Sequence, residues 1–192
     1  MSKSHVIGFY GHTDASSIKS TGDAKYSCLS NFSRCSFVIG GRTFCSTEQY
    51  LHWNKARLFN DRRVAKLIMA EVSKDDLDAT AGVWMSKMKE VKALGRKVKG
   101  FEVKLWSELC FDIMLEGLYA KFSKKKKLRK ILLGTGHDTL AEASFRDKIW
   151  GIGLATNNAD IQNPEKWKGQ NLLGQALMKT RKRLRAEEET AK

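Results

Sequence analysis

A carboxylate and an amine, Glu48 and Lys55, are the best-spaced candidates for chemistry in this chain. They lie almost two helical turns apart, so a helix would place both side chains on nearly the same face. A carboxylate can transfer protons, and an amine of lowered pKa can attack an electrophilic carbon. Tyr50, Trp53 and Phe59 predict that this helix is largely buried, where charges are costly unless paired or used. The alternative is structural, because an acid in the first turn also interacts favourably with the helix dipole.

A second candidate segment is Glu142 to Gly153, which reads EASFRDKIWGIG. It combines the carboxylates of Glu142 and Asp147 with Trp150 and Gly151, and it fits neither an amphipathic helix nor an alternating strand. A ring on a loop can form a flat wall for a planar ligand such as a nucleobase. The neighbouring glycine permits close backbone approach to phosphate or sugar. The alternative is a surface loop anchored by a buried Trp.

Several elements are predicted around these candidates. His5–Tyr10 is a short apolar run that indicates a buried strand, and Gly40-Gly41 predicts a hairpin between Ser36–Ile39 and Arg42–Cys45. Ser46 followed three residues later by Gln49 is typical of a capping box and predicts a helix to about Phe59. A second helix is expected from Asn60 or Asp61. Ser73–Gly100 is polar and lysine-rich, and we expect a loop or short helical pieces there.

The C-terminal half predicts further helices and one strand. The expected ranges are Phe101–Phe122 and Leu128–Leu133 for two helices, Thr139–Ala143 for a strand, and Asn171–Leu184 for a final helix. We therefore predict an α+β fold, a single helix-rich domain with a small β-sheet that spans residues 1–192. A basic C-terminal tail is expected from about residue 185.

The composition indicates a soluble globular protein with a polyanionic partner. The net charge is +14, and positive residues are concentrated in Lys121–Lys130 and Lys179–Arg185. Excess positive charge favours nucleic acid, nucleotides or phosphorylated metabolites, although each run is equally consistent with a solvated helix face. The four cysteines form no CxxC pair and the four histidines are scattered, so no metal site is expected. No membrane contact is expected, and we predict a cytoplasmic location with reduced thiols, without excluding access to the nucleus.

The chain resembles the YbiA-like or NADAR family, whose name refers to NAD and ADP-ribose. Short matching stretches run in order along nearly the whole sequence. They are Phe9-Tyr10, Leu29 to Phe32, Glu48 to Tyr50 with Lys55-Ala56, Leu94 to Arg96, Trp106, Lys121-Phe122, Leu132 to Gly136, Glu142 with Asp147, Trp150 to Gly153, and Gly169 to Gly174. Asn54 stands where the family usually has Gln, and Ser73–Lys89 matches poorly.

The resemblance implies a YbiA-like fold and hydrolysis of an N-glycosidic bond, with no cofactor. The resemblance implies either a phosphorylated riboflavin-pathway intermediate or ADP-ribose attached to guanine bases of nucleic acid as substrate, and the net charge of +14 favours the second. In that reading Lys55 forms an imine with the opened sugar, Glu48 shuttles protons and Asp147 orients the ribose hydroxyls. The expected substrate-binding residues are Tyr10, Asn31, Phe32, Arg96, Trp106, Glu142, Trp150, Gly151 and Asn171.

Two other readings remain open. Members of the same family are similar to N-glycosidases that act on phosphorylated intermediates of riboflavin biosynthesis. From a different class, the chain could be a non-catalytic module that binds ADP-ribose or nucleic acid. That reading expects the carboxylates to be lost while the aromatic residues persist, whereas Glu48, Glu142 and Asp147 are all present.

Overall fold

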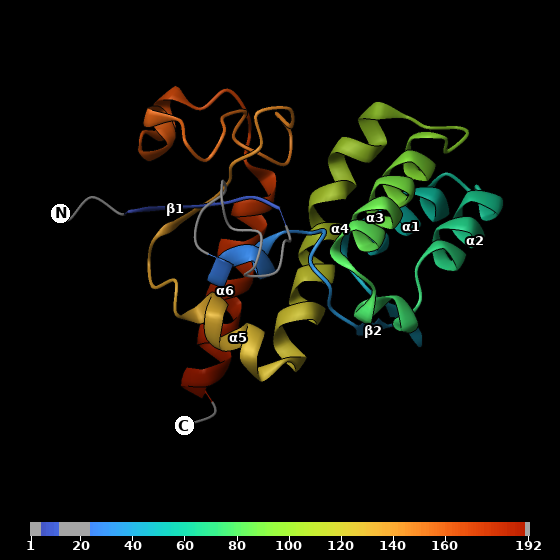
Figure 1. The fold of residues 1–192 in the computed structure, drawn as a ribbon, viewed down its shortest axis with the longest axis horizontal. Coiled ribbons are helices and arrows are strands. Elements are labelled where there is room, and N and C mark those ends of the chain that lie inside the picture. Colours follow the sequence, from blue (N-terminus) through green and yellow to red (C-terminus); the bar gives the residue numbers. More distant parts are fainter. Residues whose placement is uncertain (1–4, 12–23, 191–192) are drawn as a thin grey trace. The chain divides into compact units, whose positions relative to one another are not determined.

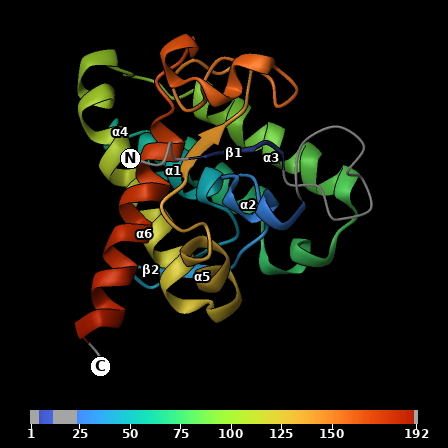
Figure 2. The same ribbon diagram turned by 90° about the vertical axis from the view of Figure 1, so that its left-hand side faces the viewer.

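A computed structural model describes residues 5–11 and 24–190. These residues form two compact units. One combines the N-terminal residues up to Ser33 with those from Phe122 onward, and the other is Arg34–Lys121. Helices dominate both units, and each unit contains one small sheet (Figures 1 and 2). The predicted helix-rich α+β class is confirmed.

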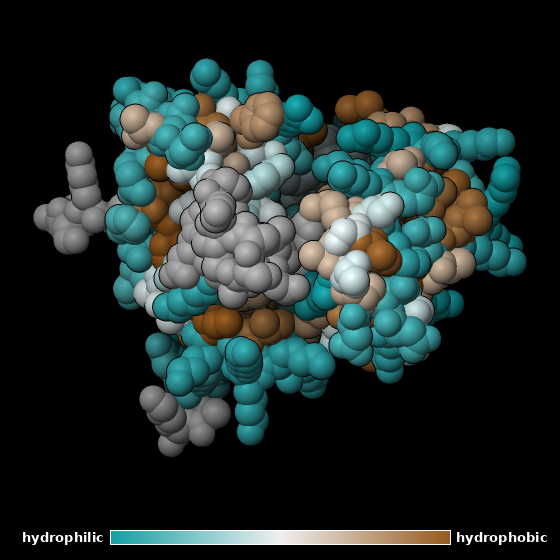
Figure 3. Space-filling view, viewed as in Figure 1, coloured by the Kyte–Doolittle hydropathy of each residue, from teal (hydrophilic) through white to brown (hydrophobic). Residues whose placement is uncertain are grey.

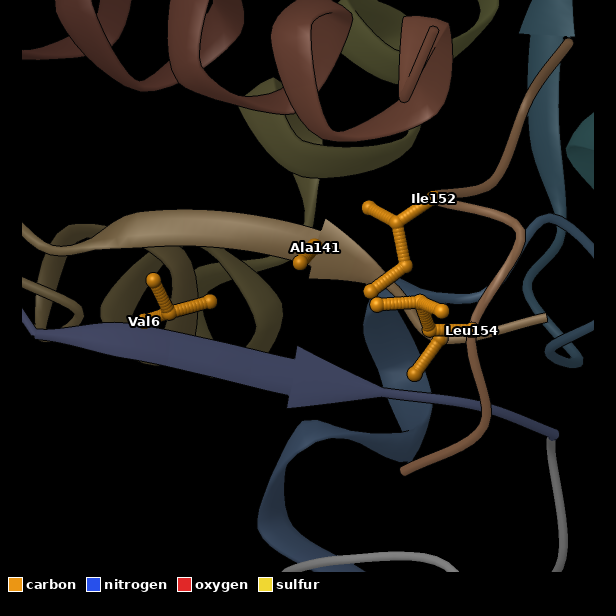
Figure 4. Packing of buried hydrophobic residues seen from close by; sticks show 5 residues of the cluster. Val6, Ala141, Ile152 and Leu154 are labelled. Atoms are coloured by element: carbon orange, nitrogen blue, oxygen red, sulfur yellow. The ribbon is translucent and has the colours of Figure 1, made fainter. Parts of the chain in front are cut away.

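The first unit is built on a parallel pair of strands that are far apart in the sequence. Strand β1 (Val6–Phe9) pairs with β4 (Thr139–Glu142), and Phe9 lies opposite Glu142. Both strands were predicted. One face of this pair carries an apolar cluster, part of which Figure 4 shows close up. The cluster consists of Val6, Ala141, Ala143, Ile152 and Leu154, with Ile161 and Trp167 packed against it.

Helix α6 (Leu172–Thr190) packs on β4, beside α5 (Lys126–Leu133), as Figure 2 shows. The contact with β4 is close at Gly174, where an added Cβ would lie 2.1 Å from the carbonyl oxygen of Leu140. Residues 185–190, expected as a basic tail, continue α6. Short 3₁₀ helices complete the unit: η2 (Ala24–Leu29), η4 (Ala159–Gln162) and η5 (Pro164–Lys166).

The second unit begins with the predicted hairpin. Strands β2 (Phe37–Ile39) and β3 (Arg42–Phe44) are antiparallel, and the turn requires glycine because Gly40 and Gly41 have φ of 55° and 74°. Three mutually packed helices follow: α1 (Thr47–Leu58), α2 (Arg62–Glu71) and α3 (Ala81–Arg96). Helix α4 (Val103–Lys124) begins in this unit.

The expectation of a loop or short helical pieces over Ser73–Gly100 was wrong. Only η3 (Lys74–Asp78) is a short piece, and α3 fills the rest of the segment as a helix of 16 residues. Trp84, Met88 and Val91 recur at helical spacing and are fully buried. The prediction failed because the lysines between the buried residues made the segment look polar, although lysine is a good helix former on an exposed face.

The two basic runs are not uniformly solvated. Lys121 is 0% exposed and Arg181 is 6% exposed. Arg181 donates to the hydroxyl of Thr135 at 2.6 Å, and Arg185 donates to the carbonyl of Leu133 at the end of α5. Several of these cations therefore bind the protein itself. Hydrophilic residues nevertheless predominate on the face shown in Figure 3. Within the described ranges, no helix is long and apolar enough to cross a bilayer.

Candidate active site

Glu48 lies in the first turn of α1, and the bonds at the start of this helix fix its position. The backbone N–H of Gln49 donates to the Ser46 hydroxyl at 3.0 Å, which confirms Ser46 as the N-cap, although the Gln49 side chain accepts from Cys45 and not from Ser46 as in a capping box. The Gln49 carboxamide accepts from the backbone N–H of Cys45 at 2.8 Å and donates to the carbonyls of Ile68 and Val72. These bonds join the N-terminus of α1 to the end of α2, so the first turn that carries Glu48 is fixed from two sides.

Glu48 is paired with a histidine that the sequence analysis did not select. Glu48 is 2% exposed, and its Oε1 lies 3.0 Å from Nε2 of His52, one turn further along α1. The opposite ring nitrogen, Nδ1, is buried without a hydrogen-bond partner among the described residues. This arrangement suits the tautomer in which Nε2–H donates to the carboxylate. The spacing of four residues from Glu48 was the available signal.

Lys55 lies in an aromatic environment in the second unit. Its Nζ is 3.9 Å from the ring centroid of Phe101 and 5.7 Å from that of Trp106. Burial, and then the positive charge of Arg96, lower the pKa of Lys55 below its ordinary value of 10.5. A larger fraction of the side chain is therefore the neutral amine near neutral pH, which is the nucleophilic form. Phe101 was not among the predicted site residues.

The Glu142–Gly153 segment in the first unit is irregular, as predicted, and its shape is defined by hydrogen bonds. Oδ1 of Asp147 accepts from the backbone N–H groups of Ile149 at 3.0 Å and Trp150 at 2.8 Å. The carboxylate thus forms an Asx-type turn, which holds the backbone N–H groups of Ile149 and Trp150 in place. Trp150 itself is half-buried, and Ile149 is exposed.

Asn171 holds this segment to β4. It has a φ of 55° and is almost fully buried. Its side-chain Oδ1 accepts from the backbone N–H of Glu142 at 3.1 Å, and its Nδ2 donates to the carbonyl of Leu140 at 2.8 Å. The predicted close approach at Gly151 is made by the chain's own backbone, because an added Cβ would lie 2.9 Å from the carbonyl oxygen of Glu142.

The remaining predicted residues also lie in the first unit. Tyr10 follows β1 and is 41% exposed. Asn31 and Phe32 are half-buried in the turn after η2, where the backbone N–H of Phe32 donates to the Ser30 hydroxyl at 3.2 Å. In the second unit, by contrast, Arg96 and Trp106 both interact with Lys55. Glu48 lies on the same helix as Lys55, seven residues before it.

Among residues 5–11 and 24–190, no three His, Cys, Asp or Glu side chains are grouped so that they could hold a metal ion. Glu48 supplies a carboxylate suited to proton transfer, and Lys55 supplies an amine suited to attack on carbon.

Comparison with known proteins identifies the family. Residues 9–185 match the NADAR domain, and the chain therefore belongs to the NADAR family. The NMR structure of the Escherichia coli protein YbiA has a TM-score of 0.69 to this chain at 26% identity, covering 98% of this chain and 89% of that one. The predicted YbiA-like fold is confirmed.

Relatives give the class of activity. An N-glycosidase of Acanthamoeba polyphaga mimivirus is 44% identical over 139 residues, which are 72% of this chain and 73% of the relative. An N-glycosidase of Nostoc punctiforme is 29% identical over 83% of this chain and 86% of its own length. By homology the chain is an N-glycosidase. A riboflavin biosynthesis protein of Vibrio vulnificus is 28% identical over 84% of this chain, a match that spans 36% of that longer protein.

Proposed function

We propose that this N-glycosidase removes ADP-ribose from guanine bases of nucleic acid. The charge supports this substrate, since a net charge of +14 favours a polyanion. Arg96 supports it as well, because it is a cation close enough to Lys55 to affect its pKa and could hold a phosphate of the substrate. The main observation behind the proposal is the position of the Lys55 amine, which lies against the rings of Phe101 and Trp106 and is influenced by the charge of Arg96.

The proposed first step forms an imine. The neutral amine of Lys55 attacks the anomeric carbon, and the bond from that carbon to the guanine nitrogen breaks. One amine proton passes to the base nitrogen and the other to the ring oxygen, which becomes a hydroxyl as the sugar opens. Glu48, hydrogen-bonded to His52, carries the proton to the leaving base.

Water completes the reaction. It adds to the imine carbon, the bond from that carbon to Nζ breaks, and ADP-ribose leaves while the amine is restored. The net change is one water consumed and one C–N bond hydrolysed. In the second unit, Trp106 is proposed to stack on a ring of the substrate. In the first unit, the proposed roles are stacking for Trp150, orientation of the ribose hydroxyls for Asp147, and substrate contact for Tyr10, Asn31, Phe32 and Glu142. Gly151 and Asn171 hold the loop that carries Trp150 through their own hydrogen bonds.

The test is reductive trapping during turnover. The protein is incubated with an ADP-ribosylated oligonucleotide in the presence of borohydride, and the modified peptide is located by mass spectrometry. We expect a reduced sugar adduct on Lys55 and no activity in Lys55→Ala. Lys104→Ala is the matched control, because Lys104 is an exposed lysine of the same unit, on α4, and should leave activity unchanged. An active Lys55→Ala without adduct in the wild type would replace the imine with direct attack by water.

A phosphorylated riboflavin-pathway intermediate is the second candidate substrate. The observation that favours it is the similarity to the Vibrio vulnificus riboflavin biosynthesis protein. The same experiment is run with such an intermediate, and release of ribose phosphate is measured beside release of ADP-ribose. We expect the ADP-ribosylated guanine to be cleaved with the higher kcat/KM. The opposite ranking assigns the protein to riboflavin intermediates, and release from neither supports a binding module.

A further inference from the structure

A pocket lies in the Arg34–Lys121 unit, formed by β3, α1 and α2. Its volume is about 490 Å³, within the range of small-molecule sites. We call it the Trp53 pocket. It is lined by Arg42, Trp53, Arg57, Arg62, Ala65, Lys66, Met69 and Ala70.

The Trp53 pocket is separate from the proposed nucleophile. Arg57 follows Lys55 by two residues on α1, and two helical residues turn a side chain to roughly the opposite face. Trp53 precedes Lys55 by two residues and is likewise turned away from it. The proposed catalytic mechanism uses none of the residues that line this pocket.

The charges of the pocket are all positive. Arg42, Arg57, Arg62 and Lys66 line it, and no carboxylate does. Within residues 5–11 and 24–190, none of these four cations forms an ion pair with an acidic side chain. Like charges brought together without counter-ions repel one another, and an anionic ligand relieves that repulsion.

Arg62 adds a cation at the N-terminal end of α2. It is the first residue of that helix and follows Asp61, whose carboxylate caps the helix by accepting from the backbone N–H of Val64 at 3.0 Å. The helix dipole is therefore already matched by an acid at this end. The side chain of Arg62 is exposed and adds to the positive lining of the pocket.

Trp53 gives the pocket an aromatic surface. Its ring centroid lies 5.3 Å from Cζ of Arg42 and 5.8 Å from Cζ of Arg57, and Phe44 meets the ring edge-on. The indole is half-buried, so part of it reaches the surface. Cations interleaved with an aromatic ring are the combination that binds single-stranded nucleic acid, with the cations on phosphates and a base on the ring.

We propose that the Trp53 pocket binds one strand of a nucleic acid, as an accessory site on the far side of α1 from Lys55. Arg42, Arg57, Arg62 and Lys66 contact phosphate oxygens, and Trp53 stacks with a base. The inference rests on the proposed function for the identity of its partner. The pocket then holds the strand that carries the modified guanine and raises its local concentration at the enzyme.

Binding of an unmodified single-stranded DNA dodecamer tests the proposal. Fluorescence anisotropy is measured at several salt concentrations for the wild type and for the double variant Arg57→Gln/Lys66→Gln. Both side chains are exposed, so the variant should remain folded. We expect at least about a tenfold loss of affinity and a salt slope smaller by about 1.4, because each phosphate contact to a single strand contributes about 0.7.

The matched control is Lys89→Gln/Lys97→Gln, which removes the same charge from exposed lysines of the same unit. We expect the control to retain most of the affinity. Trp53→Leu should lose about 5-fold to 100-fold, the typical contribution of one stacked base. Equal losses in both double variants, or full affinity in Trp53→Leu, would overturn the accessory site in favour of diffuse attraction.

Cleavage assays separate this proposal from the proposed function. Two substrates are compared, an ADP-ribosylated guanine mononucleotide and an ADP-ribosylated dodecamer. For Arg57→Gln/Lys66→Gln we expect kcat/KM to fall about tenfold on the dodecamer and to stay unchanged on the mononucleotide. If the double variant changes kcat/KM by the same factor on both substrates, the accessory site is rejected and the proposed function stands. If the wild type cleaves neither substrate, the proposed function is rejected. The anisotropy measurement still decides whether the Trp53 pocket binds a nucleic-acid strand.

Discussion

Gly95 of α3 lies directly against the imidazole of His52 on α1. A Cβ at position 95 would be 2.0 Å from Nδ1 of His52, far inside van der Waals contact. Glycine within a helix costs about 1 kcal/mol relative to alanine, yet here it lets the two helices approach. The same contact keeps the His52 ring where Nε2 meets the carboxylate of Glu48.

Gly95→Ala should therefore be harmful despite the better helix propensity of alanine. We expect a loss of about 1–3 kcal/mol in the free energy of unfolding, since overpacking a close contact costs that much. Activity should fall as His52 moves from Glu48. Gly82→Ala is the control in the same helix, because no atom lies within 4 Å of its added Cβ. Equal stability changes in the two variants, measured by urea unfolding, would contradict the role of the contact.

The activity of Lys55 should depend on pH in a specific direction. Its pKa is below 10.5, so the neutral amine, and with it kcat, should increase as pH rises through the lowered pKa. Arg96→Gln removes the like charge that contributes to the shift, and the midpoint of the rise should move to higher pH. Lys97→Gln, next in the chain, should leave the midpoint in place. A midpoint at the same pH in Arg96→Gln and wild type would disprove the coupling.

The same pKa shift has a consequence for stability. Between the lowered pKa of folded Lys55 and the ordinary pKa of the unfolded chain, the unfolded state binds more protons, so this residue's contribution to stability rises with pH. We expect Lys55→Met to be stabilised relative to wild type most at neutral pH and least above pH about 10.5. Thermal unfolding across this range measures the difference.

Two roles of Asp147, shaping the loop and supplying a negative charge, can be tested separately. Its Oδ1 accepts two backbone N–H bonds, and the side-chain oxygen of Asn can accept both. Asp147→Asn should keep the stability of wild type but lose about a hundredfold in kcat/KM if the charge orients the sugar. Asp147→Ala should lose stability as well. Near-wild-type kinetics in Asp147→Asn would restrict Asp147 to the shape of the loop.

Asn171 should contribute to stability through both its amide and its backbone. Asn171→Gly tolerates the φ of 55° but leaves the buried N–H of Glu142 and the carbonyl of Leu140 without that partner, at a cost of about 2 kcal/mol. Asn171→Ala adds about 1 kcal/mol of backbone strain. The two variants are compared by chemical unfolding, and identical values would show that the left-handed conformation contributes nothing.

Local signals in the sequence predicted much of the fold. The Gly40-Gly41 hairpin and the Ser46–Gln49 cap depend on neighbouring residues alone, and both were placed correctly. Helix α3 was missed because its buried stripe is divided by lysines, and the stripe becomes evident only when α1 and α2 cover it. Local patterns cannot show which surface another element will cover.

The candidate site was predicted unevenly for a similar reason. Glu48 and Lys55 were selected from their spacing, and the helix that carries both is confirmed as α1, whereas their catalytic roles stay predictions. His52 and Phe101 were not, because their importance arises from contacts with Glu48 and Lys55 in three dimensions. The bonds of the Asn171 amide to β4 could not be predicted either, because that partner lies about 30 residues away in the chain.

The Glu142–Gly153 segment is fastened largely through main-chain atoms. The N–H of Ile152 donates to the carbonyl of Glu142, and the N–H groups of residues 170–173 donate to carbonyls of residues 148–151. Phe145, Arg146 and Ile149 take no part in these bonds through their side chains, and all three are exposed. Substitutions at these three positions should therefore change the outer surface of the loop while its backbone frame keeps its shape.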